Sequence, residues 1–330
     1  MLSQWLKFTM EFITRDYNSI TLDGAKGTIT KTSSEKRLQN ESHYYVKIPS
    51  KVAHYFPRYI SYSEGKDYSL ELEYLPFENL GKLWLNSTLD DTLWSNVCKY
   101  LQKAISTFGD IPYSHENPSL LREKMFVDKT EKEYHSLVTN FNFFSTLDSF
   151  DYVTINSKKY KNFNTLWKQF LKEHVLEEYC GNNPLSFMHG DLCFSNILCG
   201  YDKDKNVVLK FIDPRGSFGE DGCIGDVYYD LAKLMHSVDG KYECFIYDEF
   251  DLTTHTPDTF SLSFNTGLKD LSPLFSKYLY ANHDETKIKV IQGLIFIGMC
   301  ARHYDSHERQ VAMYLTGLRI LNECEEIINA

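Results

Sequence analysis

The sequence lacks paired cysteines and long apolar segments. Its eight cysteines are scattered over 330 residues without a C-x-x-C pair, so neither a zinc ribbon nor a thioredoxin-type redox motif is predicted. Reduced thiols in a cytoplasmic protein are the simplest interpretation. No apolar run approaches the roughly 20 residues that span a bilayer, and the longest, Val290 to Cys300, is interrupted by Gln292 and predicts a buried helix. Met1 to Thr14 also lacks the basic-then-apolar order of a signal peptide.

Basic residues are outnumbered by acidic ones. The chain has 35 lysines and arginines against 45 aspartates and glutamates, a formal net charge of -10. Such a chain repels a phosphate backbone, so no nucleic-acid partner is expected, although a local basic pocket for a nucleotide is compatible with this charge. Apolar residues, in contrast, are plentiful. At 42% hydrophobic and 15% aromatic, the chain can build the core of one large or two ordinary domains.

Two kinds of pattern divide the chain near residue 75. Before that point strand-like runs alternate with turns, at Ser19 to Leu22, Thr28 to Thr32 and Tyr68 to Tyr74. A segment between them, Ser34 to Val46, has helical spacing and predicts one helix on a small sheet. The sequence therefore predicts an α+β chain with units at 1–75 and 76–330.

The second unit is predicted to be mainly helical. Its amphipathic segments are Leu80 to Phe108, Leu120 to Phe143, Phe163 to Tyr179 and Lys287 to Ile328. One strand-rich interval, Ile197 to Ile212, interrupts the helices.

That interval predicts a hairpin with polar side chains at its open end. Asn196 begins one apolar run, and Asp213 follows the second, with Asp202 to Asn206 as the polar connection. A two-residue turn would pair Ile197 with Ile212 and set Asn196 opposite Asp213. A four-residue loop would shift the pairing but keep both residues at that end.

Carboxylate and amide oxygens held at one point suit Mg²⁺, which is bound together with substrate phosphates. Phosphoryl transfer needs this metal and a carboxylate beside the attacking hydroxyl. Asp191 enters the same end of the hairpin five residues before Asn196. Asp191 is therefore the predicted catalytic residue, and Asn196 and Asp213 are the predicted metal ligands.

The alternative is a loop cap at Asp191 and a turn residue at Asp213. Either is common alone, but their joint placement favours the site.

The triplet His189-Gly190-Asp191, with Asn196 five residues later and Asp213 at a strand end, resembles the aminoglycoside phosphotransferase and choline kinase group of the protein-kinase-like superfamily. Pro214 departs from the Phe-Gly that follows this aspartate in protein kinases. The resemblance implies a two-lobed protein-kinase-like fold, with a nucleotide-binding N-terminal lobe and a larger catalytic and substrate-binding lobe. It also implies the same roles for Asp191, Asn196 and Asp213.

Downstream, Gly225 to Ala232 resembles the Gly-Asp-x-x-x-Asp-Leu-Ala helix of that group. The resemblance implies that Asp226, the first aspartate, braces the catalytic loop. Asp230 is expected to be a helix-end or loop anchor, and His189 is expected to orient the loop without doing chemistry.

The nucleotide contacts are expected in the first lobe. Glu41 lies three residues from Leu38 and four from Tyr45, which puts it on the apolar face of its helix, where a carboxylate needs a cation. Lys31 is the nearest strand lysine. The resemblance implies that this pair holds the phosphates, with Lys26 as the alternative lysine.

Two further segments bear on the nucleotide. Leu72 to Pro76 resembles the hinge whose backbone binds adenine, which makes Glu73 and Leu75 candidate nucleotide contacts. Asp23 to Gly27 is either a glycine loop over the phosphates or a plain hairpin turn.

The expected activity is transfer of phosphate from ATP or GTP to a hydroxyl of a sugar, an amino alcohol or an aminoglycoside, with a preference for a cell-surface or capsule sugar. The acidity of the chain would suit a cationic acceptor, although net charge says little about one pocket. Arg215 could reach a phosphate or an anionic substrate, or form a surface ion pair. Arg302 could line the substrate or balance a helix dipole. The rival interpretation is an inactive kinase-like nucleotide-binding module.

Overall fold

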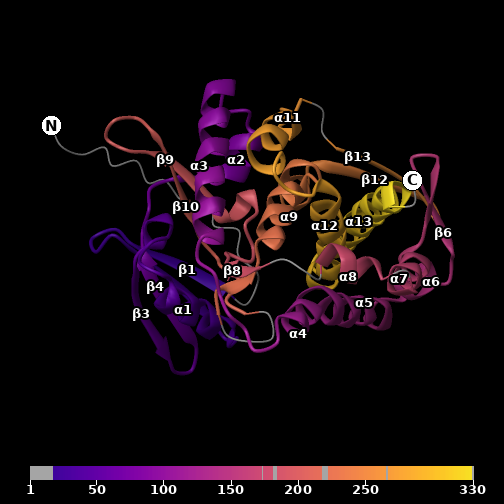
Figure 1. The fold of residues 1–330 in the computed structure, drawn as a ribbon, viewed down its shortest axis with the longest axis horizontal. Coiled ribbons are helices and arrows are strands. Elements are labelled where there is room, and N and C mark those ends of the chain that lie inside the picture. Colours follow the sequence, from indigo (N-terminus) through magenta and orange to yellow (C-terminus); the bar gives the residue numbers. More distant parts are fainter. Residues whose placement is uncertain (1–17, 173, 181–183, 218–221, 265–266, 329–330) are drawn as a thin grey trace.

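The computed structural model describes residues 18–172, 174–180, 184–217, 222–264 and 267–328. Met1 to Thr14, for which no signal peptide is predicted, lies outside these residues. The described chain forms two lobes, a small one built from the first strands and a larger, mainly helical one (Figure 1). The predicted α+β, two-lobed architecture is confirmed.

The small lobe is a four-stranded antiparallel sheet with one helix. Its strands are β1 (Asn18–Asp23), β2 (Thr28–Ser33), β3 (Tyr59–Glu64) and β4 (Tyr68–Glu73), in the order β1-β2-β4-β3. The helix, α1 (Arg37–Lys47), packs against β3 and β4 with Leu38 and Tyr45 both 5% exposed. Strand β2 is internal, and its Lys31 pairs with Ile20 and Leu70. Three strands and the helix match the prediction, whereas β3 was not predicted.

The large lobe contains the remaining helices. They are α2 (Leu80–Leu85), α3 (Asp91–Gly109), α4 (Pro118–Glu123), α5 (Lys129–Asn140), α6 (Asn142–Asp148), α7 (Phe163–Lys172), α8 (Val175–Cys180), α9 (Val227–Val238), α10 (Tyr242–Ile246), α11 (Ser272–Phe275), α12 (Glu285–Met299) and α13 (His307–Ile328). The predicted helix over residues 80–108 is broken in two, where Ser87 has a φ of 52°. The predicted buried helix is α12, whose residues Val290 to Gly298 are all buried. No helix among the described residues has the length and apolarity needed to cross a membrane.

A second four-stranded sheet lies in the large lobe, in segments for which the sequence analysis predicted neither helix nor strand. It joins β6 (Tyr152–Ile155), β7 (Lys158–Lys161), β12 (Phe250–Thr256) and β13 (Thr259–Phe264) in the order β12-β13-β6-β7. The sheet was not predicted because the turn signal is weak. Asn156 and Ser157 both take positive φ, 49° and 66°, as a two-residue hairpin turn requires, but without the glycine that usually marks such a turn.

The predicted hairpin is present, with its register shifted by one residue. Strands β9 (Ile197–Tyr201) and β10 (Val207–Phe211) pair Ile197 with Phe211, not with Ile212. The loop is longer than a two-residue turn because Asp202 Oδ1 accepts from the amides of Asp204 and Asn206, both at 2.8 Å. The Ile212 amide donates to the Asn196 carbonyl at 3.0 Å, so Asn196 and Asp213 still lie at the same end.

The lobes meet at a cluster of aromatic side chains. Tyr44 of α1 donates from its hydroxyl to the Met188 carbonyl at 3.0 Å, and its ring lies 5.7 Å from those of Phe56 and Phe187. The Phe56 ring in turn stacks on His189 at 6.1 Å. This packing ties the helix that carries Glu41 to the loop that carries Asp191. The seven cysteines whose side chains are described are free and buried.

Candidate active site

The loop after β8 (Leu185–Phe187) is held from below by helix α9. The Asp230 carboxylate accepts from the amides of His189 and Gly190, both at 2.7 Å. Asp226 instead begins α9 and accepts from the Tyr228 amide at 2.9 Å. The sequence assigned the brace to Asp226, and that role stays a prediction, because the hydrogen bond to Tyr228 is a cap of the free amides at the start of the helix. Asp230, one turn later, braces the loop.

His189 orients the loop, as expected. Its Nε2 lies 3.0 Å from the Ile212 carbonyl, and its Nδ1 lies 3.2 Å from the Asp191 amide. A carbonyl can only accept and an amide can only donate, so Nε2 carries the proton and Nδ1 accepts. Burial lowers the pKa of His189 to about 4. The ring is therefore neutral at neutral pH and joins Asp191 to the strand that ends before Asp213.

The next turn of the loop rests on a carboxylate that sequence reasoning missed. Glu243 of α10 is fully buried, and its Oε1 accepts from the Ser195 amide at 3.0 Å and from the hydroxyls of Ser195 and Ser237 at 3.1 Å. These bonds hold the 3₁₀ turn Phe194–Asn196. No local pattern connects Glu243 with a turn 48 residues earlier, so no sequence signal could have found it.

Asp191 and Asn196 are in contact. The Asn196 side-chain amide donates to the Asp191 carbonyl at 2.8 Å and to Asp191 Oδ2 at 3.2 Å. The Asp191 carbonyl and carboxylate can only accept, so the Asn196 atom that faces both of them is the side-chain nitrogen, and the atom on the other side is the oxygen. Asn196 Oδ1 is thus directed away from Asp191, with a fixed orientation.

A buried lysine, also missed by the sequence analysis, neutralises Asp191. Lys233 of α9 is 4% exposed, and its ammonium lies 2.7 Å from Asp191 Oδ1 and 5.3 Å from the centre of the Tyr242 ring. Burial raises the pKa of Asp191, but the Lys233 charge and hydrogen bond outweigh it and lower this pKa to about 2. The sequence did contain a signal for Lys233, because it lies three residues after Asp230 and therefore on the same face of an apolar helix.

On the small-lobe side, Lys31 bridges two acids. Its ammonium lies 2.7 Å from Glu41 Oε1 and also contacts the Asp213 carboxylate. The Lys31 and Glu41 side chains are 15% and 12% exposed, whereas Asp213 is 48% exposed. The predicted Lys31–Glu41 pair is therefore present. Lys26 is excluded as its replacement, since it is 71% exposed and pairs with Asp23 at 3.5 Å.

Asp213 also has an unusual backbone. Its φ is 56°, in the left-handed region, which aspartate tolerates better than most residues. Asp213 directly follows Ile212, whose carbonyl contacts His189 and whose amide donates to Asn196. These two contacts fix the position of the Asp213 carboxylate.

The candidate hinge residues lie at the end of β4. The Glu73 carboxylate accepts from the Arg58 amide at 3.1 Å and lines a hollow of about 370 Å³ with Tyr45 and Lys210. Its side chain is therefore turned toward the start of β3 and does not join the Lys31 ion pairs. Leu75 follows Tyr74, whose amide donates to the Gly27 carbonyl at 2.9 Å.

That contact places the Asp23 to Gly27 turn beside the hinge. Asp23 Oδ1 accepts from the amides of Ala25 and Lys26, both at 3.1 Å. Because these amides are used inside the turn, they are not offered to a phosphate. The geometry favours the plain hairpin turn over a glycine loop.

The donor set fits magnesium. Among the described residues, no three or more His, Cys, Asp or Glu side chains are grouped to hold a metal by themselves. Asp213 and the oriented Asn196 oxygen are one carboxylate and one amide on neighbouring chain segments. Mg²⁺ is commonly held this way, by one or two protein oxygens completed by water and substrate phosphates.

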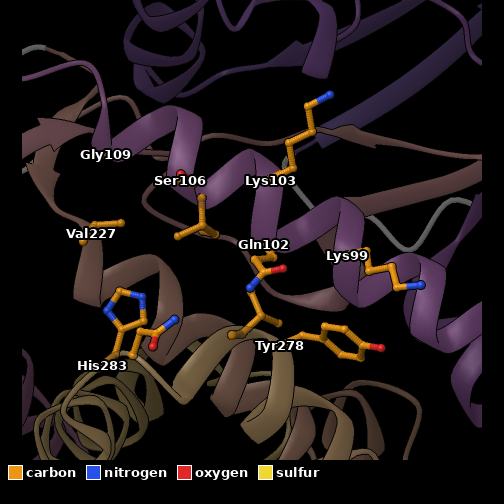
Figure 2. Close-up of a pocket in the computed structure, with 11 residues that line it drawn as sticks. Lys99, Gln102, Lys103, Ser106, Gly109, Val227, Tyr278 and His283 are labelled. Atoms are coloured by element: carbon orange, nitrogen blue, oxygen red, sulfur yellow. The ribbon is translucent and has the colours of Figure 1, made fainter.

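A separate hollow of about 480 Å³ lies between α3, α9 and the segment Ser276–Tyr280 (Figure 2). Lys99, Lys103 and His283 line it, and no predicted site residue does. In Figure 2 the two lysine side chains point apart. The hollow therefore has no converging charges, and we place the candidate site at Asp191 and Asp213.

Comparison with known proteins supports the architecture. No protein-family model and no curated protein matches the sequence. Among solved structures, a thermostable mutant of aminoglycoside phosphotransferase APH(4)-Ia in ternary complex with AMP-PNP and hygromycin B superimposes with a TM-score of 0.54 and 11% identity, covering 95% of this chain and 93% of that one. The chain has the fold of an aminoglycoside phosphotransferase.

A second APH(4)-Ia mutant, in complex with ADP and hygromycin B, gives a TM-score of 0.52 at 10% identity and covers 92% of both chains. The apo form of the thermostable mutant gives 0.50 at 11% identity, covering 94% of this chain and 89% of that one. At such low identity the likeness to APH(4)-Ia shows the fold alone.

Lys233→Met is expected to bring the acidic limb of the pH–rate profile of nucleotide turnover above about pH 4.5. The burial that raises the Asp191 pKa would remain, while the ammonium that lowers it would be gone, so Asp191 would be protonated at higher pH. Steady-state turnover measured from about pH 4.5 to about pH 8 checks this, because the wild-type limb lies below that range and only the variant should lose turnover at its acidic end. Lys132→Met, on an exposed position of α5, is the matched control. Turnover of Lys233→Met that is reduced by the same factor at every pH in this range would contradict the role of Lys233.

Proposed function

We propose that this protein is an ATP-dependent phosphotransferase that acts on a hydroxyl of a small molecule. The observation that supports this most is the presence of two ion-paired groups on neighbouring chain segments, which are joined where the Ile212 amide donates to the Asn196 carbonyl at 3.0 Å. Lys31, Glu41 and Asp213 approach from the small lobe and the end of β10, while Asp191, Asn196 and Lys233 approach from the catalytic loop and α9. Residues 1–75 would bind the nucleotide, and residues 76–330 would bind the acceptor and perform catalysis.

In this proposal Lys31 holds the α- and β-phosphates of ATP or GTP, with Glu41 fixing its position. The backbone around Glu73 and Leu75 binds the base. Asp213 and Asn196 Oδ1 hold Mg²⁺, which would neutralise charge on the transferred phosphate.

Asp191 orients the acceptor hydroxyl. A carboxylate with a pKa of about 2 is a weak base, so it acts mainly by accepting a hydrogen bond from the hydroxyl and aiming the oxygen lone pair at the γ-phosphorus. As the new P–O bond forms, the bond to the leaving nucleoside diphosphate breaks, and the hydroxyl proton passes to Asp191 late and then to water.

The fold neighbours suggest a class of acceptor. APH(4)-Ia mutants were solved in ternary complexes with a nucleotide and hygromycin B, a small molecule. By analogy we propose a sugar, an amino alcohol or an aminoglycoside as acceptor, with a cell-surface or capsule sugar preferred, and a cytoplasmic location. An inactive nucleotide-binding module is the alternative outcome of the experiments below.

Asp191→Asn is expected to keep the fold and nucleotide affinity while lowering turnover by a factor of roughly 100 or more, because an amide cannot accept the hydroxyl proton. The assay is release of nucleoside diphosphate from ATP and Mg²⁺ with pooled sugars, amino alcohols and aminoglycosides, compared with wild type. Near-normal turnover in the variant would remove Asp191 from catalysis. Nucleotide binding without turnover in wild type would favour the inactive module.

Asp213→Ala is expected to weaken Mg²⁺-dependent nucleotide binding more than Asn196→Ala, because a carboxylate neutralises charge where an amide contributes only a dipole. Nucleotide titrations with Mg²⁺ and with EDTA separate the metal-dependent part. Equal affinities in both variants and both conditions would refute the metal assignment.

A further inference from the structure

A glycine just after the proposed metal ligand lets the segment 213–216 lie directly against helix α1. Gly216 is buried and has a φ of 74°. A Cβ added at this position would lie 2.6 Å from the Asn40 carbonyl oxygen, 2.7 Å from the Asn40 carbonyl carbon and 3.2 Å from the Asn40 Cβ. These distances are too short for non-bonded atoms, so only glycine allows this approach of the two backbones.

The contact is made with backbone atoms, which cannot turn aside. At Gly225, in comparison, an added Cβ would lie 2.4 Å from the Met188 sulfur and 3.0 Å from the Met125 methyl group. Methionine side chains are flexible and can adapt to such a change. The Asn40 carbonyl, in contrast, moves only with its helix. A larger residue at position 216 must therefore displace either α1 or the segment 213–216.

The segment is also attached to the loop of Asp191. The Arg215 amide donates to the His189 carbonyl at 3.0 Å. The Gly222 amide donates to the Gly216 carbonyl, also at 3.0 Å, which fixes the chain beyond the contact. Helix α1 therefore rests on a part of the large lobe that is held by its own hydrogen bonds.

Helix α1 is joined to the same segment a second time, through an ion pair. Glu41 directly follows Asn40, and its carboxylate lies 2.7 Å from the Lys31 ammonium, which also contacts Asp213. Because Gly216 is three residues after Asp213, the two contacts form a closed ring. A shift of α1 relative to Gly216 would therefore change the distance between the Lys31–Glu41 pair and Asp213.

Resting on the proposed function, we infer that Gly216 is a positioning residue for Lys31. The close approach of Gly216 to α1 sets the separation between Glu41, which holds the lysine, and Asp213, the proposed metal ligand. Lys31 and the metal would bind the phosphates of one nucleotide, so this separation has to match the phosphate spacing. Charge-assisted hydrogen bonds weaken when donor and acceptor are moved apart.

The first experiment needs no nucleotide. Amide hydrogen exchange in α1 and α9 is measured by mass spectrometry for wild type, Gly216→Ala and Gly267→Ala. Gly267 is the matched control, since its φ is also positive, 104°, but an added Cβ would meet nothing within 4 Å. Gly216→Ala is expected to speed exchange in α1 by about 10-fold or more and to leave α9 close to wild type, because a displaced helix loses packing. Unchanged exchange in α1, or an equal increase in Gly267→Ala, would overturn the inference.

The second experiment tests whether Gly216 acts through Lys31. Affinity for AMP-PNP with Mg²⁺ is measured for Gly216→Ala in the wild-type and Lys31→Ala backgrounds. The expected loss is about 10-fold or more when Lys31 is present and about 3-fold or less when it is absent, because changes that act through one group are not additive. Equal losses in the two backgrounds would indicate a general structural effect and overturn the inference.

Gly216→Asn separates the close contact from backbone strain. Asparagine tolerates the left-handed region better than alanine does, but its Cβ would meet the same Asn40 atoms. This variant is therefore expected to bind AMP-PNP no better than Gly216→Ala. Affinity restored to near the wild-type value in Gly216→Asn would identify strain as the cause and overturn the inference.

The inference and the proposed function fail separately. A wild-type protein that binds no nucleotide would contradict the proposed function. Faster exchange confined to α1 in Gly216→Ala would, in that case, still support the placement of the Lys31–Glu41 pair by Gly216. Normal nucleotide binding and turnover in Gly216→Ala would overturn the inference and leave the proposed function standing.

Discussion

Helix α9 carries a buried acid and a buried base on which the geometry of the candidate site depends. Asp230 binds the two amides that begin the loop of Asp191. Lys233, three residues after Asp230 on the helix, pairs with the Asp191 carboxylate. Buried charges must be paired or hydrogen-bonded to be tolerated. Because the hydrogen bonds of Asp230 and the ion pair of Lys233 are both made with the loop, the loop conformation and the packing of α9 determine each other.

Charged side chains are also paired across the two lobes. Lys31 of the small lobe contacts Asp213 of the large lobe while remaining paired to Glu41. His189 then connects the strand end at Ile212 to the Asp191 amide. The opposite charges that a nucleotide and its metal would meet are thus already positioned. The side chains of Asp213 and Asp191, 48% and 42% exposed, are the most open to solvent among these ion-paired groups. A site arranged in advance in this way suits a reaction whose catalysis rests on positioning and electrostatics.

Short-range patterns predicted much of this site. The spacing of Asp191, Asn196 and Asp213 along one hairpin and the helical spacing of Glu41 are local features, and the structure brings Asp191 to Asn196 and Lys31 to Glu41 and Asp213. The parts that failed depend on long-range contacts or on a single side chain within a loop. The hairpin register was set by the Asp202 side chain, the second sheet joins segments about a hundred residues apart, and Glu243 reaches a turn 48 residues earlier. Asp230 anchors the loop, which is one of the two roles expected for it. The sequence could not show that Asp226 caps α9, because helix capping and loop bracing both use a buried aspartate and only the position of the helix end distinguishes them.

The most direct test of the phosphoryl-transfer assignment is a crystal structure of the protein with Mg²⁺ and AMP-PNP. We expect the metal to be bound by Asp213 and Asn196 Oδ1, and the Lys31 ammonium to move from Asp213 to the α- and β-phosphates while keeping its contact with Glu41. The γ-phosphate should face Asp191. Nucleotide bound elsewhere, for example in the hollow lined by Lys99 and Lys103, or metal held without Asp213, would contradict the assignment.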